Sequence, residues 1–146
     1  MGTPSVYANF KLRQHNGNPI DLDTDTIKVM IVTSAYTFNA TTHVFKSDLT
    51  GEVSGTNYSA GGTAISGVTV ALDGSTVEWI HNDITWTQSA GAGFSNGRSF
   101  VWYKDTGVAA TSPLIMCQSE ASDFGNVAGD LTLDGSAATG VLNITG

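Results

Sequence analysis

The side chains that could act as nucleophiles lack the partners that catalysis requires. Residues 93–97 read Gly-Phe-Ser-Asn-Gly, which has the spacing of the sharp nucleophile turn in many hydrolases. That turn needs a strand entering it, a helix leaving it and a catalytic histidine later in the chain. Here a glycine-rich segment leads to Ser95, a predicted strand follows it, and all three histidines precede it. We therefore predict that the chain is not an enzyme and has no catalytic residues.

Three aspartates alternate in one short segment, at Asp21, Asp23 and Asp25. A calcium loop with this beginning needs glycine at its sixth place and glutamate at its twelfth, where this chain has Thr26 and Val32. In extended backbone the three carboxylates would share one face, where like charges repel unless a cation bridges them. Because calcium takes six or more oxygen ligands, we favour a solvated acidic loop, and weak calcium binding stays open.

A further polar cluster contains Glu78, His81 and Asp83. Glu78 and His81 have opposite parity, so they face opposite sides of a straight strand and cannot form one site alone. We expect a strand end and a turn. Cys117 lies within an apolar run and is predicted to be a small core side chain. The sequence thus predicts no metal site and no cofactor.

The composition indicates which scaffold must carry these residues. The chain has 146 residues, close to the commonest domain size, so we expect one domain with one core. Charged residues make up only 13%, and 17 glycines accompany many serines and threonines. Short apolar runs separated by turn residues are typical of β-strands, and no window of a dozen residues has a convincing helical stripe. The sequence predicts an all-β fold.

Alternating and β-branched runs locate the strands. They cover residues 27–33, 68–72, 77–79, 84–87, 99–104, 114–119, 131–133 and 141–145. Residues 73–75 and 134–136 both read Asp-Gly-Ser between such runs, so each predicts a hairpin. The best helical candidate is a single turn in residues 42–49. About 8–10 short strands predict a single-domain antiparallel β-sandwich, and jelly-roll-like and immunoglobulin-like arrangements stay open.

The first residues of the chain are more polar than the rest. Every second residue from Val6 to Leu12 is apolar, which predicts a strand with one apolar face, and a turn-rich stretch follows. We predict that residues 1–26 form an extended arm, or an edge strand with a polar linker. Residues 27–146 then form the β-sandwich domain.

Six aromatic side chains are open to two interpretations. They are Trp79, Trp86, Phe94, Phe100, Trp102 and Tyr103. Aromatic residues most often fill a sandwich core, where each buries about 150–250 Å². Phe100 and Trp102 share one parity and Tyr103 has the other, so both faces of that strand should be covered. A sugar-stacking platform is the alternative.

The net charge excludes several classes of partner. A formal charge of −7, with six scattered basic residues, disfavours nucleic acid, because Lys and Arg supply most of that affinity. No apolar stretch approaches the roughly 20 residues of a membrane helix, and the N-terminal residues do not resemble a signal peptide. A composition typical of secreted β proteins without an export signal favours a virus-particle component, or a substrate of non-classical export.

Six segments of the chain resemble a group of small tailed-bacteriophage proteins that are associated with virion structural genes. They are IKVMIVTSAY at 27–36, THVF at 42–45, EVSGTNYSAGG at 52–62, DITW at 83–86, YKDTG at 103–107 and SPLI at 112–115. None of these segments carries a catalytic or ligand-binding meaning. The resemblance implies a β-rich virion structural protein, such as a capsid decoration or cement protein, assembled in the host cytoplasm and located on the capsid surface.

This role implies the major capsid protein as partner and a homo-oligomer, for which a trimer would suit three-fold positions. A cement protein needs an arm or edge strand that bonds to neighbouring subunits, and many weak contacts then add over the lattice. The residues expected to contact the partner are Val6, Tyr7, Phe10, Lys11, Leu12 and Arg13. We expect that removing residues 1–20 leaves the fold intact and abolishes attachment.

The alternative function is a phage tail or fibre module that recognises host-surface glycan. Such a module should expose at least two of four aromatic side chains, Trp79, Trp86, Phe94 and Trp102. A cement protein should instead expose an apolar or backbone edge. The surface of the folded chain therefore separates the two functions.

Overall fold

The computed structural model describes residues 2–135 and 142–145, and these form an all-β, single-domain fold in which strands pair antiparallel. The strands are β1 (Ser5–Val6), β2 (Ile27–Val32), β3 (Thr63–Ala64), β4 (Thr69–Asp73), β5 (Thr76–Ile80), β6 (Ile84–Trp86), β7 (Gly97–Lys104), β8 (Leu114–Phe124), β9 (Leu131–Leu133) and β10 (Leu142–Thr145). One α-helix, α1 (Ala8–Arg13), and two 3₁₀ turns, η1 (Lys46–Asp48) and η2 (Ala109–Thr111), accompany them. The predicted fold class is confirmed.

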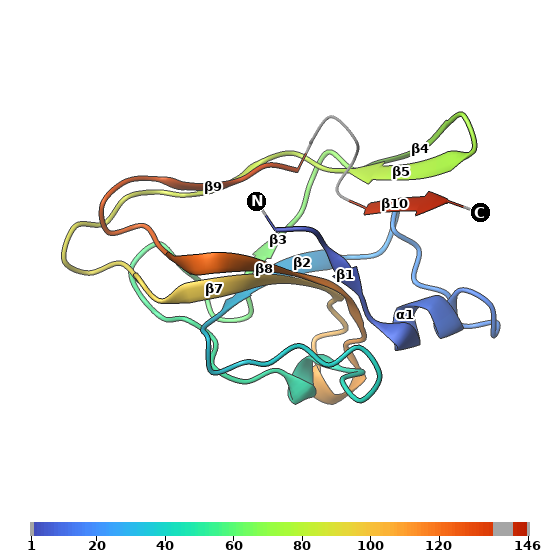
Figure 1. The fold of residues 1–146 in the computed structure, drawn as a ribbon, viewed down its shortest axis with the longest axis horizontal. Helices are drawn as coiled ribbons and strands as arrows, with labels where there is room; N and C mark the ends of the chain where they lie inside the picture. Colours follow the sequence, from blue (N-terminus) through green and yellow to red (C-terminus); the bar gives the residue numbers. More distant parts are fainter. Residues whose placement is uncertain (1, 136–141, 146) are drawn as a thin grey trace.

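The strands form one large sheet and two small ones. The large sheet has the order β1-β8-β7-β2-β3, and the small sheets have the orders β10-β5-β4 and β6-β9. Figure 1 shows both small sheets on the same side of the large sheet, with α1 at one end. The arrangement is sandwich-like, with the small sheets placed end to end as the second layer.

The large sheet is buried on both faces. Its central strands β2 and β7 are nearly continuous in apolar residues, as strands without a solvent-facing side must be. Ile31 and Trp102 face the small sheets, where they join a core that includes Trp79 and Leu142. Met30 and Tyr103 belong to a second cluster on the opposite face of the sheet. The expectation that both faces of residues 99–104 are covered is confirmed.

The second cluster is covered by chain without strands. Tyr36 is buried there, and Phe38 and Leu49 pack against the same cluster. The 3₁₀ turn η1 lies within residues 42–49, where the sequence predicted a single helical turn. Gly62 is required at the edge of β2, because its φ is +85° and an added Cβ would collide with the carbonyl group of Val29.

The N-terminal segment corrects a sequence prediction. Only Ser5–Val6 is a strand, at the edge of the large sheet, and Ala8–Arg13 is helical, so the extended strand predicted through Leu12 is wrong. A helix of six residues is too short to be stable alone. Its position is set by tertiary contacts, because the N–H of Tyr7 donates to Ile115 O and the N–H of Ala8 donates to Ala40 O. The alternation of apolar residues therefore predicted the two-residue period of a strand where the chain has the period of a helix.

Residues 1–26 are also not a separate arm. Tyr7, Phe10 and Ile20 are all buried, and each belongs to one of the two apolar clusters of the body. The predicted domain boundary at residue 26 was based on the polar residues between these side chains. It is wrong because a few large apolar side chains suffice to anchor a polar segment. The edge-strand part of the prediction holds for β1 alone.

The two Asp-Gly-Ser segments have different structures. The first forms the predicted hairpin, since Asp73 pairs with Thr76 and Gly74 takes a φ of +62° in the turn. The second hairpin is wrong, because β9 pairs with β6 and β10 pairs with β5. Gly135 bonds instead to the segment after β5: its N–H donates to Asp83 and its carbonyl accepts from the N–H of His81. Ser136 lies outside the described residues.

Candidate functional site

Ser95 lies in a loop that leads into β7, and its side chain is exposed. The entering loop and leaving strand are those expected from the sequence, and they differ from the hydrolase turn, which a strand enters and a helix leaves. The N–H of the preceding residue, Phe94, donates to the buried side chain of Asn126 over 3.0 Å. The segment is therefore held by a structural contact. The prediction that the chain is not an enzyme stays a prediction.

The aspartates of the 21–25 segment bond to their own loop. Asp21 Oδ1 accepts from the N–H groups of Asp23 and Thr24. The Thr24 side chain, together with these N–H groups, holds the pKa of Asp21 below its usual value. Asp25 Oδ2 accepts from the Asp21 N–H and pairs with Lys104 Nζ at 2.8 Å. Across residues 2–135 and 142–145, no three His, Cys, Asp or Glu side chains are placed to hold a metal ion.

His81 is a buried structural residue. Its Nδ1 lies 2.7 Å from Asn82 O, and the indole N–H of Trp102 donates to its Nε2 over 3.2 Å. Because an indole N–H can only donate, His81 is neutral with its proton on Nδ1. Burial lowers the pKa of His81 below 6.5. Cys117 is likewise buried, and burial raises the pKa of its thiol.

The residues predicted to contact a partner are divided by the structure. Tyr7 and Phe10 are buried in the core, so their assignment to an external contact is wrong, and Val6 is half-buried on β1. Leu12 is 59% exposed and Lys11 is also exposed. Arg13 is partly buried and lines a pocket beside α1. The anchoring and the accessible residues of α1 are thus neighbours in sequence that differ in burial, with Phe10 buried and Lys11 and Leu12 exposed.

The aromatic residues that a glycan site would use are all in the core. Trp79, Trp86, Phe94 and Trp102 are each no more than 2% exposed. Trp86 stacks on Phe100 with ring centroids 6.0 Å apart, so its flat face is already occupied. The exposure that the glycan-binding alternative required of these four side chains does not occur.

A different element exposes apolar side chains. All five residues of β4 are exposed, and among them Leu72 is 75% and Val70 is 41% exposed. The strand lies at the edge of its sheet, with β5 as its neighbour. Figure 1 shows the β4–β5 hairpin extending away from the large sheet toward the periphery of the molecule. We name residues Thr69–Asp73 the β4 edge.

The turn of the hairpin determines which backbone groups of the β4 edge are free. Asp73 and Thr76 flank a two-residue turn, so they form a hydrogen-bonded pair, and pairs alternate from there. Val70 and Leu72 therefore occupy non-hydrogen-bonded positions, where the N–H and C=O point away from β5. The same two residues present both the free backbone groups and the exposed apolar side chains.

The apolar face of the β4 edge continues into the core. Residues directly opposite one another share a face, which places Val70 beside Trp79 and Leu72 beside Val77. Val77 is half-buried and Trp79 is buried. Asp73 has the other parity, so this face carries no charged residue of β4 or β5. Val70 and Leu72 thus form an exposed apolar strip on the β4 edge, and the buried Trp79 fixes the position of the strip at its Val70 end.

Two buried polar networks were not predicted from the sequence. Asn126 joins three loops: its Nδ2 donates to Thr56 O and Thr87 O, and its Oδ1 accepts from the Phe94 N–H. A single asparagine after a glycine carries no sequence signal of this role. The second network connects the hydroxyls of Tyr7 and Tyr36 at 2.7 Å, and burial raises the pKa of Tyr36 to about 12.

Comparison of the chain with protein-family models, with curated proteins and with solved structures found no significant match. No helix in the described part of the chain is long and apolar enough to span a membrane. We therefore argue function from the residues of this chain.

Proposed function

We propose that the chain is a bacteriophage virion structural protein that decorates the capsid and attaches to it through the β4 edge. The observation that carries this proposal is the β4 edge itself, where Val70 and Leu72 offer free backbone groups and exposed apolar side chains. Natural β proteins usually protect such edges with charge, proline or a covering loop, because they pair with other chains. An edge left open in this way is suited to attachment.

The occupant of the edge is an extended segment of a capsid subunit. Such a segment would pair with β4 as an added strand, so that its backbone bonds to Val70 and Leu72 and its apolar side chains cover the strip. One such contact is weak, but the copies on a shell act together when the protein is itself an oligomer. The rigid two-layer body would then connect neighbouring capsid subunits and so stabilise the particle.

The first experiment measures the copy number. Quantitative mass spectrometry of purified particles from the encoding phage should find hundreds of copies of the chain per particle. Tens of copies would favour a tail or fibre location and contradict the capsid assignment. Absence from the particles would overturn the proposal altogether.

The second experiment tests the β4 edge directly, by rebinding purified protein to particles that lack it. V70P removes an outward N–H without disturbing the bonds to β5, since proline is tolerated at such edge positions. L72D places a charge on the apolar strip. Both variants should lose at least about tenfold in affinity. V108D is the matched control, because Val108 is also a large exposed apolar residue but lies in a loop.

The control outcomes separate attachment from folding and from self-association. Melting curves of V70P and L72D should remain close to that of the unmodified protein. If V108D weakens attachment as much as L72D does, the β4 edge is not the attachment surface. If the β4 edge instead pairs two copies, light scattering will show an oligomer that L72D dissociates while particle binding remains.

A further inference from the structure

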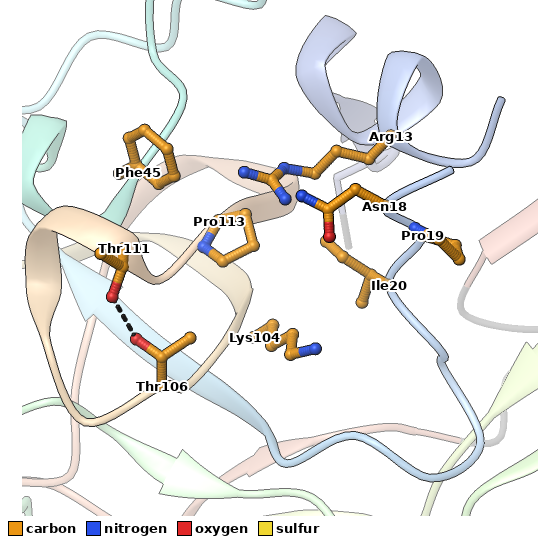
Figure 2. Close-up of a pocket in the computed structure, with 9 residues that line it drawn as sticks. All are labelled: Arg13, Asn18, Pro19, Ile20, Phe45, Lys104, Thr106, Thr111 and Pro113. Atoms are coloured by element: carbon orange, nitrogen blue, oxygen red, sulfur yellow. Dashed lines mark hydrogen bonds between the residues drawn. The ribbon is translucent and has the colours of Figure 1, made fainter. Parts of the chain in front are cut away.

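A pocket lies between α1, the segment that follows it and the end of β7. Its volume is about 310 Å³. The lining residues are Arg13, Asn18, Pro19, Ile20, Phe45, Lys104, Thr106, Thr111 and Pro113. Figure 2 shows Arg13 extending from α1 toward Phe45, with Asn18 and Pro113 near its guanidinium and Lys104 farther away. The pocket therefore combines apolar and uncharged polar walls with two cationic side chains.

Arg13 is a cation without a counter-ion. Within the described residues its guanidinium makes no hydrogen bond and no ion pair, and its Nε is buried without an acceptor. In the part of the chain that the structure describes, the guanidinium lies over the ring of Phe45, whose centroid is 5.6 Å from Arg13 Cζ. Leaving a buried charged donor without an acceptor is costly, so an acceptor that entered the pocket would remove this cost.

Lys104 is already neutralised. Its Nζ pairs with Asp25 Oδ2 at 2.8 Å, and its charge also interacts with Asp21. The hydroxyls of Thr106 and Thr111 bond to each other over 2.7 Å, as Figure 2 shows. Arg13 is therefore the charged group of this pocket that is free to bind a ligand.

We propose that this pocket binds a carboxylate group carried on an apolar stem, with Arg13 as its main ligand. A guanidinium presents parallel N–H donors that match the two oxygens of a carboxylate. One uncompensated positive charge fits a monoanion better than a phosphate dianion. Phe45, Ile20 and Pro113 form the part of the wall that an aliphatic stem would contact. The inference is independent of the proposed attachment to capsids.

A carboxylate of this kind has two sources in proteins, an acidic side chain and the carboxylate of a chain terminus. Blocked pentapeptides distinguish them: acetyl-Ala-Ala-Glu-Ala-Ala-amide presents only the side chain, and acetyl-pentaalanine with a free carboxylate presents only the terminus. The glutamine analogue and the pentaalanine amide are the uncharged counterparts. Inorganic phosphate tests whether any anion is accepted.

The readout is the NMR signal of the Arg13 Nε–H group during titration, which reports on the pocket itself. At least one carboxylate peptide should shift this signal saturably, and its uncharged counterpart should not. In variants that lack the Arg13 Nε–H group, the backbone amide signals of Thr106 and Thr111, which line the same pocket, follow the titration instead. R13Q should weaken binding at least about tenfold, whereas R13K should weaken it less. K11Q is the matched control, since Lys11 is an exposed neighbour on α1 and the change in net charge is the same.

The opposite results would overturn the inference. Equal binding of charged and uncharged peptides, or unchanged binding by R13Q, would show that Arg13 does not hold a carboxylate. A phosphate affinity equal to that of the peptides would replace the carboxylate assignment with a general anion site. If R13Q is poorly folded, R13K decides the question: it should bind the carboxylate peptide more weakly than the unmodified protein, and equal binding would show that the guanidinium is not the ligand.

Discussion

The large sheet and the β4–β5 hairpin are built from similar strands but have opposite surroundings. In β2, Ile31 and Val32 are fully buried on opposite faces, whereas in β4 every residue is exposed. The β2–β7 pair and the β4–β5 pair are both antiparallel, and both contain β-branched and apolar residues. The difference shows that burial here is decided by what the fold places above each strand. We infer that the large sheet provides most of the folding stability of the chain and that the β4–β5 hairpin provides the contact with a partner.

The largest effect is expected when the N-terminal anchor of the body is removed. Deleting residues 1–20 removes the buried side chains of Tyr7, Phe10 and Ile20 and exposes the edge of β8. A Phe→Ala change alone typically costs about 3–5 kcal/mol, in a total stability of about 5–15 kcal/mol. We expect the truncated chain to lose its cooperative thermal transition in near-UV circular dichroism. An unchanged melting curve would show that the segment is an independent arm after all.

Matched truncations in the two regions sharpen the comparison. I31A removes a fully buried side chain from β2, and we expect a loss of about 2–5 kcal/mol in the free energy of unfolding. L72A removes a side chain that is largely exposed on β4, and we expect a change within about 0.5 kcal/mol. Urea denaturation measures both. Similar losses in the two variants would mean that the hairpin contributes to the core as the body does.

The loop network of Asn126 should have the next largest effect. N126A leaves the N–H of Phe94 and the carbonyls of Thr56 and Thr87 without their partner, at a cost of roughly 2–3 kcal/mol. N96A is the control, because Asn96 is exposed, and it should cost less than about 0.5 kcal/mol. Thermal denaturation of the two variants checks this. Equal melting temperatures would show that the three loops are held by other contacts.

The smallest effect concerns pH. Burial lowers the pKa of His81 in the folded state, so the unfolded chain binds its proton first as the pH falls. The free energy of unfolding is therefore not reduced by His81 at pH values well above 6.5, and it falls as the pH drops below 6.5. The pKa values of Asp48 and Asp105 are also lowered, so these two carboxylates stabilise the fold at neutral pH and lose this contribution only below about pH 3.8. We expect the free energy of unfolding to fall between pH 7.5 and pH 5.5.

His81 can be tested against a second histidine. H81Q should be less stable at pH 7.5, but its stability should change much less down to pH 5.5. H15Q should retain the slope of the unmodified protein, because His15 is exposed. A slope that survives H81Q would assign the pH dependence to another group.

Strong local signals predicted most of the body from the sequence. The run at 27–33 became β2, and the Asp-Gly turn at 73–75 joined β4 to β5, because each is determined by its own residues. Where tertiary contacts decide the structure, the prediction failed. The helix at Ala8–Arg13 is held by distant backbone groups, and Gly135 is tied to the end of β5 rather than to a local turn.

The candidate site was only partly readable for the same reason. The sequence singled out Arg13 only as a basic residue on the polar face of a predicted strand, and the pocket around it is assembled from segments that are distant in the chain. Val70 and Leu72 were assigned to a strand as apolar residues, and their pattern does not differ from that of a buried strand. Exposure of the β4 edge depends on a missing neighbour in space, which no local pattern records.

Hydrogen exchange at two backbone amides tests the account most directly. In the free protein the outward N–H groups of Val70 and Leu72 should exchange rapidly, while amides of β2 remain protected. When the protein is bound to particles, mass spectrometry with residue-level fragmentation should show these two amides strongly protected. Full attachment with unchanged exchange at Val70 and Leu72 would show that the chain binds through another surface.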